Sequence, residues 1–292
     1  MIPAFNAQRF LGDALDSVAR QTLRPMECIV VDDGSVDNTR AIASQHPACT
    51  TCITQANRGV SAARNVGAAR AQGSLLAFLD ADDAWLPERL ERMTRRMIRE
   101  HAQAVLCATW LADESLNPST RLSISPGLTA ERMLLHEVSL VSPSSNLLIE
   151  HRAFDAIGGF SESFSTSADW YVTFRIVEEL EWVYEPEPLV LYRRHSGGMS
   201  RNIDRMASEM LGVYREIFAA AGGERLTIRR RALGSLHRVL AGSYFASGRT
   251  RAGVQHAVKS VLLAPTEVWN FAASGGHHVV RRLRGRVPTG PD

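Results

Sequence analysis

The chain has 292 residues, of which 45% are hydrophobic and 22% charged, and its formal net charge is +2 at pH 7. These totals are typical of a globular protein with one large domain, or with a domain and an appendage. The balanced charge argues against a nucleic-acid partner, and no apolar run approaches the roughly 20 residues that cross a bilayer, so we predict a cytoplasmic protein.

The four cysteines, Cys28, Cys49, Cys52 and Cys107, are too few and too scattered for a disulfide framework in a chain of this size. Cys49 and Cys52 form a CxxC pair, but no second pair of cysteines or histidines completes a zinc site. We therefore predict reduced thiols rather than a metal or redox centre.

Strands and helices alternate over the first hundred residues. Short apolar runs predict three strands, at 27–31, 52–54 and 75–79. Helical spacing and capping residues predict four helices, at 10–18, 37–45, 57–73 and 87–101. Asn6 is the expected N-cap of the first helix. This alternation indicates a parallel sheet with right-handed connections.

The stretch Ser74–Asp83 reads SLLAFLDADD and carries the clearest chemical signal. Its apolar run is typical of a buried strand of a parallel sheet, and three carboxylates follow where such sheets bind ligands: Asp80, Asp82 and Asp83. Acids this close stay ionised together when they are solvated, hydrogen-bonded or bridged by a cation. They predict either a polar turn that caps the next helix or a divalent-metal site for a phosphorylated ligand.

The following segment, up to residue 201, mixes strands with irregular stretches. Strands are predicted at 104–110, 146–149, 182–184 and 189–192, the last two as a pair. An amphipathic helix is expected to begin at Asp169. The stretches 111–143 and 161–168 lack a regular pattern, and we expect them to be loops that select the acceptor.

Beyond Arg201 only helical patterns occur. Residues 244–265 have the glycine and small-residue spacing of one tetratricopeptide-type helix pair, which we expect to be a packed appendage. The tail 269–286 contains aromatic residues and four arginines, Arg281, Arg282, Arg284 and Arg286. It is interpreted either as a frayed, solvated end or as a peripheral contact with an anionic membrane face.

Seven motifs occur in order along residues 1–201: IPAFNA, VVDDGSVDNT, NRGVSAARNVG, FLDADD, IGGF, ADW and LYRRHSGGMS. Together they resemble the successive motifs of family 2 inverting glycosyltransferases with the GT-A fold, of the bacterial polysaccharide-biosynthesis type. The resemblance implies an α/β, Rossmann-like and mostly parallel sheet, in which residues 1–110 bind a nucleotide-sugar and 111–201 bind the acceptor. Residues 202–292 then form a C-terminal helical region with a basic tail.

The same resemblance implies a reaction. A sugar moves from a nucleotide-diphospho-sugar, with UDP- or dTDP-type donors favoured, to an acceptor hydroxyl with inversion, and Mg²⁺ or Mn²⁺ is the expected cofactor. The expected acceptor is a glycan, a lipid-linked molecule or a protein. The expected location is the cytoplasm, with the inner face of the cell membrane as the alternative that the basic tail suggests.

The resemblance also implies roles for individual residues. The implied donor-binding residues are Pro3, Ala4, Asp32, Asp33, Arg64, Asp80, Arg194 and Arg201. The implied metal ligands are Asp82, Asp80 and His195. Asp169 matches the catalytic base. Structural roles remain open for three of these residues, because Asp169 also suits a helix N-terminus and a single Arg64 or His195 can serve packing alone.

Two departures from the family pattern qualify these expectations. Ala168 stands where many relatives have Glu or His beside the base, which affects the expected orientation of the acceptor. Relatives carry several more apolar residues before IPAFN, so we expect either a start upstream of Met1 or a shortened first strand. Two alternative functions also remain, a non-catalytic nucleotide-sugar binding module and a nucleotidyltransferase, although Pro3–Arg9 lacks the glycine-rich loop with lysine that the latter requires.

Overall fold

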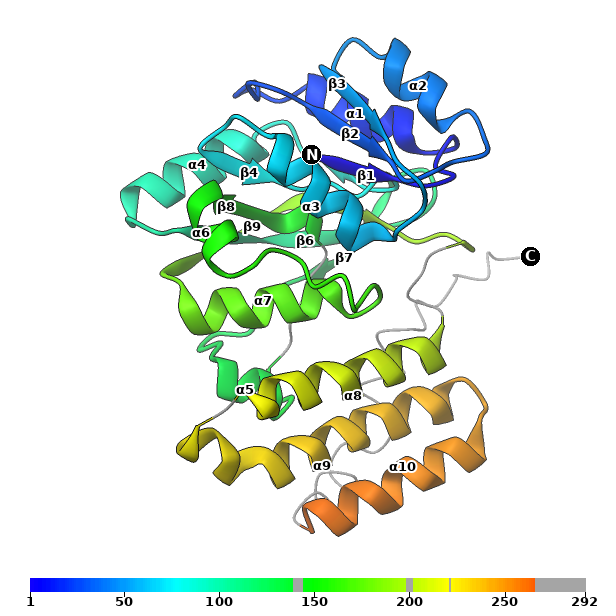
Figure 1. Ribbon diagram of the computed structural model, residues 1–292, viewed down its shortest axis with the longest axis vertical. Coiled ribbons are helices and arrows are strands. Elements are labelled where there is room, and N and C mark those ends of the chain that lie inside the picture. Colours follow the sequence, from blue (N-terminus) through cyan, green and yellow to red (C-terminus); the bar gives the residue numbers. More distant parts are fainter. Residues whose placement is uncertain (139–143, 198–201, 221, 266–292) are drawn as a thin grey trace, which may run out of the picture. The chain divides into compact units, whose positions relative to one another are not determined.

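The structure is a computed structural model that describes residues 1–138, 144–197, 202–220 and 222–265 (Figure 1). The chain divides into an α/β unit, residues 1–130 and 139–199, and a helical unit, residues 131–138 and 200–292. We predicted a boundary at residue 201. The structure groups the short segment 131–138 with the helices that follow that boundary.

The α/β unit begins with a three-stranded parallel sheet. Its strands, in spatial order, are β1 (Ile2–Ala4), β2 (Ile29–Asp32) and β3 (Thr51–Thr54). The connecting helices are α1 (Leu11–Ala19), α2 (Thr39–Gln45) and α3 (Val60–Arg70). Every residue of β1 and β2 is buried, as expected for apolar strands covered by helices.

Asn6 does not cap α1, which corrects the sequence prediction. The helix begins at Leu11, and the Asn6 side chain instead accepts a hydrogen bond of 3.0 Å from the backbone N–H of Val36. Asn6 has a positive φ of 48°, a conformation that Asn tolerates better than most residues. It therefore links the loop after β1 to the loop after β2.

A second sheet has six strands in the order β4-β8-β6-β9-β5, with β7 paired to β6. The strands are β4 (Leu75–Ala77), β5 (Ala84–Trp85), β6 (Ala104–Ala112), β7 (Pro118–Leu122), β8 (Leu147–Glu150) and β9 (Trp182–Arg193). The β6–β9 pair is parallel, and the other pairs of this sheet are antiparallel. The parallel arrangement that we predicted therefore holds for the first sheet, while the second is mixed.

Strand β4 is antiparallel to its ladder partner β8, although we expected it in a parallel sheet. Its other edge meets the start of the chain. The Met1 ammonium donates a 2.9 Å hydrogen bond to the Ala77 carbonyl, and the Leu79 N–H donates one of 3.0 Å to the Met1 carbonyl. These two bonds have the parallel pattern and connect the two sheets at β1 and β4.

Strand β9 runs unbroken from Trp182 to Arg193, where the sequence predicted two short strands. Pro186 and Pro188 interrupt the apolar pattern and caused that error. The register against β6 shifts between Cys107 and Thr109, opposite the two prolines, so the extra residues bulge out without ending the ladder. Strand β7 was also missed, because four of its five residues are exposed.

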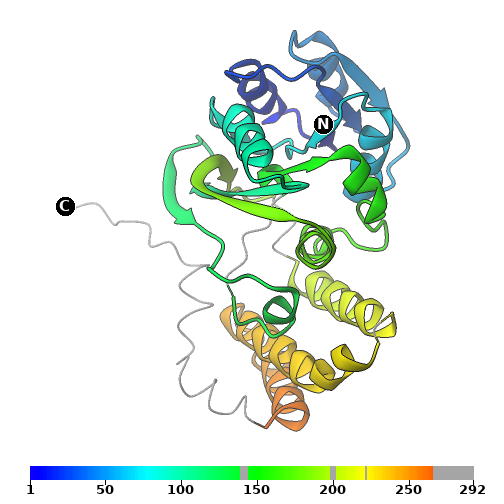
Figure 2. The ribbon, with the colours of Figure 1, turned by 90° about the vertical axis from the view of Figure 1, so that its left-hand side faces the viewer.

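Helices cover both faces of the six-stranded sheet, with α4 (Arg89–Arg99) on one face and α7 (Ala168–Glu179) on the other (Figures 1 and 2). The short helix α6 (His151–Ala156) follows β8. Apolar side chains from the first sheet, α1, α4 and the second sheet form one buried cluster. The site residues lie beside this core, in the segments that follow β4 and β9 and in the turn that precedes β8.

The helical unit contains α5 (Ala130–Leu134), α8 (Ile203–Ala219), α9 (Gly223–Ala246) and α10 (Thr250–Leu263). Helices α9 and α10 form a close hairpin (Figure 1). A Cβ added to Gly234 would lie 2.6 Å from the Ala264 Cβ, and one added to Gly253 would lie 2.6 Å from the Phe245 ring. The small-residue spacing therefore reflects tight helix contact. No helix among the described residues is long and apolar enough to span a membrane.

Candidate active site

The acids that follow β4 occupy different environments. Asp83 is fully buried, and its carboxylate accepts hydrogen bonds from the Ser145 hydroxyl (2.6 Å) and from the backbone N–H of Arg193 (3.0 Å). Burial, with the neighbouring charges of Asp82 and Asp80, raises the pKa of Asp83 well above its usual value. Asp83 therefore stabilises the loop, while Asp80 and Asp82 are partly exposed.

Arg64 on α3 joins two of the predicted site carboxylates. One terminal nitrogen lies 2.6 Å from Asp80 Oδ1 and the other lies 2.9 Å from Asp169 Oδ1. The Arg64 side chain is 2% exposed, against 21% for Asp80 and 27% for Asp169. Its guanidinium also stacks over the Phe160 ring at 4.8 Å. Arg64 is thus a buried cation that fixes the separation of two more accessible acids.

Asp169 lies in the first turn of α7, where the sequence predicted it. In addition to Arg64, the Ser144 hydroxyl donates a short hydrogen bond to Asp169 Oδ1. Burial raises the pKa of the Asp169 carboxyl, while the charge of Arg64 opposes that rise. A carboxylate with a raised pKa and a partly exposed surface suits proton transfer.

Asp82 and His195 face each other at the end of β9. His195 Nε2 lies 2.9 Å from Asp82 Oδ2, and the His195 ring packs edge-on against Phe10 with 4.8 Å between centroids. Burial and the charge of Asp80 raise the pKa of Asp82, and the hydrogen bond to His195 opposes that rise. One carboxylate and one imidazole therefore meet beside Asp80 in the loop 80–83, which we call the acid loop.

The predicted nucleoside residues lie at the ends of β1 and β2. Pro3 and Ala4 pair with Val31 and Asp32 across the parallel ladder. Asp33 accepts hydrogen bonds from the Gln55 side chain (2.7 Å) and from the backbone N–H groups that follow it, those of Arg58 (2.9 Å) and Gly59 (2.8 Å). The Asp32 carboxylate accepts a hydrogen bond of 3.1 Å from the Ser35 N–H. Asp33 therefore orders the segment before α3.

Of the two arginines predicted to contact the diphosphate, the structure describes Arg194 but not Arg201. Arg194 is exposed, and its backbone N–H donates a 3.0 Å hydrogen bond to the Ala112 carbonyl. Arg201 lies outside the described residues. The preceding residue, Arg193, is buried and donates to the Asp82 carbonyl (2.7 Å) and to Asp13 (2.7 Å). In a strand neighbouring side chains point to opposite faces, but the sequence does not indicate which of two adjacent arginines points inward.

Sequence reasoning also missed the serines Ser144 and Ser145 in a short 3₁₀ helix. Ser144 donates to Asp169. The Ser145 hydroxyl donates to Asp83 and accepts a 3.0 Å hydrogen bond from the Asp80 N–H, and its carbonyl accepts one of 2.9 Å from the Trp85 indole. The two serines therefore tie the predicted base to the acid loop, and no motif that we recognised contains them.

No three His, Cys, Asp or Glu side chains converge into a metal cluster within the described residues. A cluster of that kind is not required for every divalent metal. Mg²⁺ beside a phosphorylated ligand is held by one or two carboxylates together with phosphate oxygens and water. Asp82 and His195, with Asp80 on the same loop, fit that smaller set of ligands.

Two solved structures share this architecture. TarS of S. aureus superposes with a TM-score of 0.66 at 16% identity, covering 96% of this chain and 53% of TarS. The mannosyltransferase PcManGT from Pyrobaculum calidifontis, solved with GDP-Man and Mn²⁺, gives a TM-score of 0.61 at 16% identity, covering 97% of this chain and 81% of that protein. The fold is therefore the GT-A glycosyltransferase fold that we predicted.

The sequence profile described as Glycosyl transferase family 2 matches residues 1–158, more than half of the chain. The chain therefore belongs to glycosyl transferase family 2. It is 43% identical over 97 residues to an uncharacterized glycosyltransferase of Nostoc, covering 32% of this chain and 30% of the relative. It is 38% identical over 100 residues to TuaG of Bacillus subtilis, named for teichuronic acid biosynthesis, covering 33% and 40%. The chain thus matches less than half the length of either relative.

Proposed function

We propose that this protein is an inverting glycosyltransferase that moves a sugar from a nucleotide-diphospho-sugar to a hydroxyl of a cell-surface glycan or glycoconjugate. The convergence of Asp80 and Asp169 on the buried Arg64 carries this proposal. Asp80 belongs to the acid loop and Asp169 to a helix 105 residues from Arg64 in sequence. This geometry brings a candidate proton acceptor close to a candidate donor site, as a direct transfer requires.

Asp169 is the proposed general base. It takes the proton of the acceptor hydroxyl as that oxygen bonds to the anomeric carbon, while the bond from this carbon to the diphosphate oxygen breaks on the opposite face. Ser144 and Arg64 orient the Asp169 carboxylate through hydrogen bonds. The raised pKa of Asp169 supports the role, because a stronger base accepts the proton more readily. Inversion follows from the single displacement.

A divalent cation, Mg²⁺ or Mn²⁺, is part of the proposal, with Asp82, Asp80 and His195 as its ligands. Such an ion supplies positive charge that stabilises the leaving diphosphate. The metal needs neutral His195, and the 2.9 Å between Asp82 Oδ2 and His195 Nε2 supports the choice of these two neighbouring side chains. The relative PcManGT was solved with Mn²⁺, which favours the same class of cofactor for this chain.

The donor is proposed to lie across the ends of β1, β2 and β4. Pro3, Ala4 and Asp32 would contact the nucleoside, with Asp32 rather than Asp33 accepting the imide N–H of a uracil or thymine ring. The difference in their partners supports this choice, because Asp33 already accepts three hydrogen bonds from protein groups. TarS was solved with UDP-GlcNAc, a donor of the proposed type. Arg194 and Arg201 are the proposed diphosphate contacts.

Arg64 has a different proposed role from the one implied by the family resemblance. We expected it to lie near the diphosphate. Since its two terminal nitrogens bind Asp80 and Asp169, we propose that it mainly positions the two acids. Its Nε is buried and has no hydrogen-bond partner among the described residues.

The test is a screen of UDP-, dTDP- and GDP-sugars for thermal protection and for Mg²⁺- or Mn²⁺-dependent release of nucleoside diphosphate. We expect at least one donor to protect the protein and to be turned over, with opposite anomeric configurations in donor and product. Protection by a donor without turnover, in the presence of candidate acceptors, would support the binding-module alternative. No response to any nucleotide-sugar would contradict the proposed function.

A further inference from the structure

The α9–α10 hairpin concentrates the positive charge of the protein. Between Gly223 and Leu263 the sequence has eight Arg and Lys residues and one Glu. The whole chain has 33 basic and 31 acidic residues, so the remainder carries 25 against 30 and is net acidic. A nearly neutral protein therefore carries a local excess of positive charge on this hairpin.

Helix α10 also has an exposed apolar stripe. Val254, Val258 and Leu262 recur every four residues and are 50%, 52% and 69% exposed. The opposite face of the helix, with Gly253 and Ser260, is buried, and the Ser260 hydroxyl donates a 2.7 Å hydrogen bond to the Gly234 carbonyl of α9. Packing within the hairpin therefore leaves the valine and leucine side chains facing outward.

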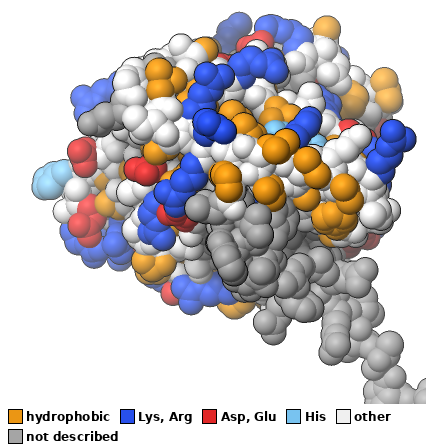
Figure 3. Space-filling view, turned by 90° about the horizontal axis from the view of Figure 1, so that it is seen from below, with side chains coloured by type: hydrophobic (Ala, Val, Ile, Leu, Met, Phe, Trp, Pro, Cys, Tyr) orange, Lys and Arg blue, Asp and Glu red, His pale blue; other side chains and the backbone are white. Residues whose placement is uncertain are grey.

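Basic side chains lie on the same outward face. Arg251 and Lys259 are exposed and lie at helical positions next to the stripe, and Arg230 of α9 reaches the Leu262 carbonyl at 3.5 Å. Figure 3 looks onto this side of the helical unit and shows hydrophobic and basic side chains intermixed there. We call the set Arg251, Val254, Val258, Lys259 and Leu262 the α10 patch. Helix α10 contains no acidic residue.

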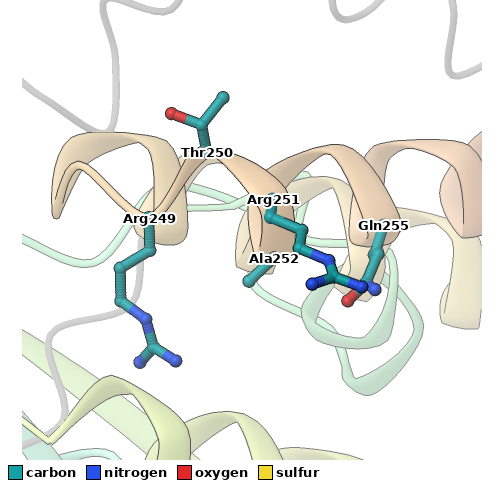
Figure 4. Close-up of a pocket in the computed structure, with 5 residues that line it drawn as sticks. All are labelled: Arg249, Thr250, Arg251, Ala252 and Gln255. Atoms are coloured by element: carbon teal, nitrogen blue, oxygen red, sulfur yellow. The ribbon is translucent and has the colours of Figure 1, made fainter.

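A hollow opens at the N-terminal end of the patch (Figure 4). It has a volume of about 550 Å³ and is lined by Arg249, Thr250, Arg251, Ala252 and Gln255. Arg249 forms an ion pair of 2.6 Å with Asp204, whereas Arg251 and Gln255 extend together along the exposed side of the helix. The hollow therefore offers a cation and amide donors at the end of an apolar stripe.

We propose that the α10 patch docks on the surface of an anionic lipid bilayer. Exposed aliphatic side chains enter the boundary between head groups and acyl chains, and basic residues beside them pair with anionic head groups, which is how amphipathic surface helices bind membranes. A soluble polyanion would use the charges but not the apolar stripe. A second copy of the chain would bring two basic faces together, and like charges oppose that contact.

This docking goes beyond the proposed transferase reaction and does not depend on it. It places the protein at a lipid surface through the described helices, independently of the arginine-rich tail 269–286, which we singled out from the sequence and which lies outside the described residues. The α10 patch contains none of the proposed donor, metal or base residues, so its variants separate membrane binding from catalysis.

The test measures co-sedimentation of the full chain with vesicles of phosphatidylcholine alone and of phosphatidylcholine mixed with phosphatidylglycerol. We expect binding to the anionic vesicles and a loss of binding as salt rises, because salt screens surface charge. The double variant Arg251→Ser/Lys259→Ser should lower the partition coefficient about 25-fold, which corresponds to about fivefold for each basic residue. Leu262→Ser should also weaken binding.

The matched control for Leu262 is Ile98→Ser, since Ile98 on α4 is equally exposed at 69% and has arginines nearby. It should leave vesicle binding unchanged. Equal binding of wild type and α10 variants, or loss of binding only when Arg281, Arg282, Arg284 and Arg286 are changed to Ser, would overturn the proposal. Binding to soluble polyphosphate without binding to vesicles, or patch-dependent dimerisation in light scattering, would overturn it as well.

Discussion

The two units place their charged side chains differently. In the α/β unit, Arg64, Asp83 and Arg193 are almost completely buried and each contacts groups far away in sequence. In the helical unit, the ion pairs Arg231–Glu137 and Arg249–Asp204 join side chains that are 38% to 61% exposed. Burying a charge costs free energy of desolvation unless the charge is paired. Paired buried charges therefore indicate a site whose side chains are held in a fixed geometry. Exposed ion pairs contribute little to stability, and their side chains remain accessible to solvent.

The largest expected effect comes from the proposed base. Asp169→Asn keeps the shape of the side chain but removes its ability to take a proton, so the transfer rate should fall about 10²- to 10⁴-fold. Donor binding and the melting temperature should change little. Steady-state kinetics measure the transfer rate. Thermal melting without and with the donor measures the melting temperature and donor binding.

Asp155→Asn is the control for Asp169, because the Asp155 side chain is 70% exposed on α6. It should retain full activity. Turnover by Asp169→Asn at the wild-type rate would reject Asp169 as the base and would leave its place in the first turn of α7 as its main role.

Arg64 directly tests the contrast between buried and exposed pairs. Arg64→Ala leaves two carboxylates without their shared cation, and we expect the free energy of unfolding to fall by about 3–5 kcal/mol. Arg231→Ala in the helical unit breaks an exposed pair and should cost about 1 kcal/mol or less. Equal losses in chemical denaturation would show that burial does not distinguish the two units.

Ser145 tests whether the missed serines hold the acid loop. Ser145→Ala removes the hydroxyl that joins Asp83 to the Asp80 N–H, and leaving these buried groups unsatisfied should cost about 1–3 kcal/mol. Ser119→Ala, which removes an exposed hydroxyl bonded to the Leu111 carbonyl, should cost within about 0.5 kcal/mol. If Ser145→Ala is as stable as the wild type and binds the donor normally, other contacts hold the acid loop in place.

The last expected effect is a dependence of stability on pH in the helical unit. His237 Nδ1 lies 2.9 Å from His256 Nδ1, and burial, with the charges of His256 and Lys259, lowers the pKa of His237 from 6.5 to about 4. The unfolded chain therefore binds a proton below about pH 6.5 that the folded helices exclude until about pH 4, so stability falls as pH falls through that range.

Hydrogen exchange of the α9 and α10 amides at pH 7 and pH 5, corrected for intrinsic exchange rates, measures this loss. His237→Gln should flatten the dependence on pH, because Gln does not titrate. Protection that rises on acidification would contradict the expected direction and would mean that the pair is stabilised by a shared proton.

Much of the α/β unit could be predicted from local patterns. The strands β2 to β4, the helices between them and the position of Asp169 in the first turn of a helix follow from apolar runs and helix-start signals, whereas β1 was expected only from the family resemblance. Three features could not. The pairing of β4 with β8 and the continuity of β9 across two prolines each depend on a partner strand distant in sequence. The inward direction of Arg193 depends on Asp13 of α1, which is also distant in sequence.

The sequence by itself determined the family resemblance, the alternation of strands and helices, and the placing of acids at strand ends, because short-range periodicity and residue chemistry are written locally. Only the tertiary structure decided which groups meet. Arg64 reaches Asp169 across 105 residues, and Ser145 reaches Asp83 across 62. Such contacts are selected by the packing of the whole unit, since a buried charge must find its partners wherever the fold supplies them.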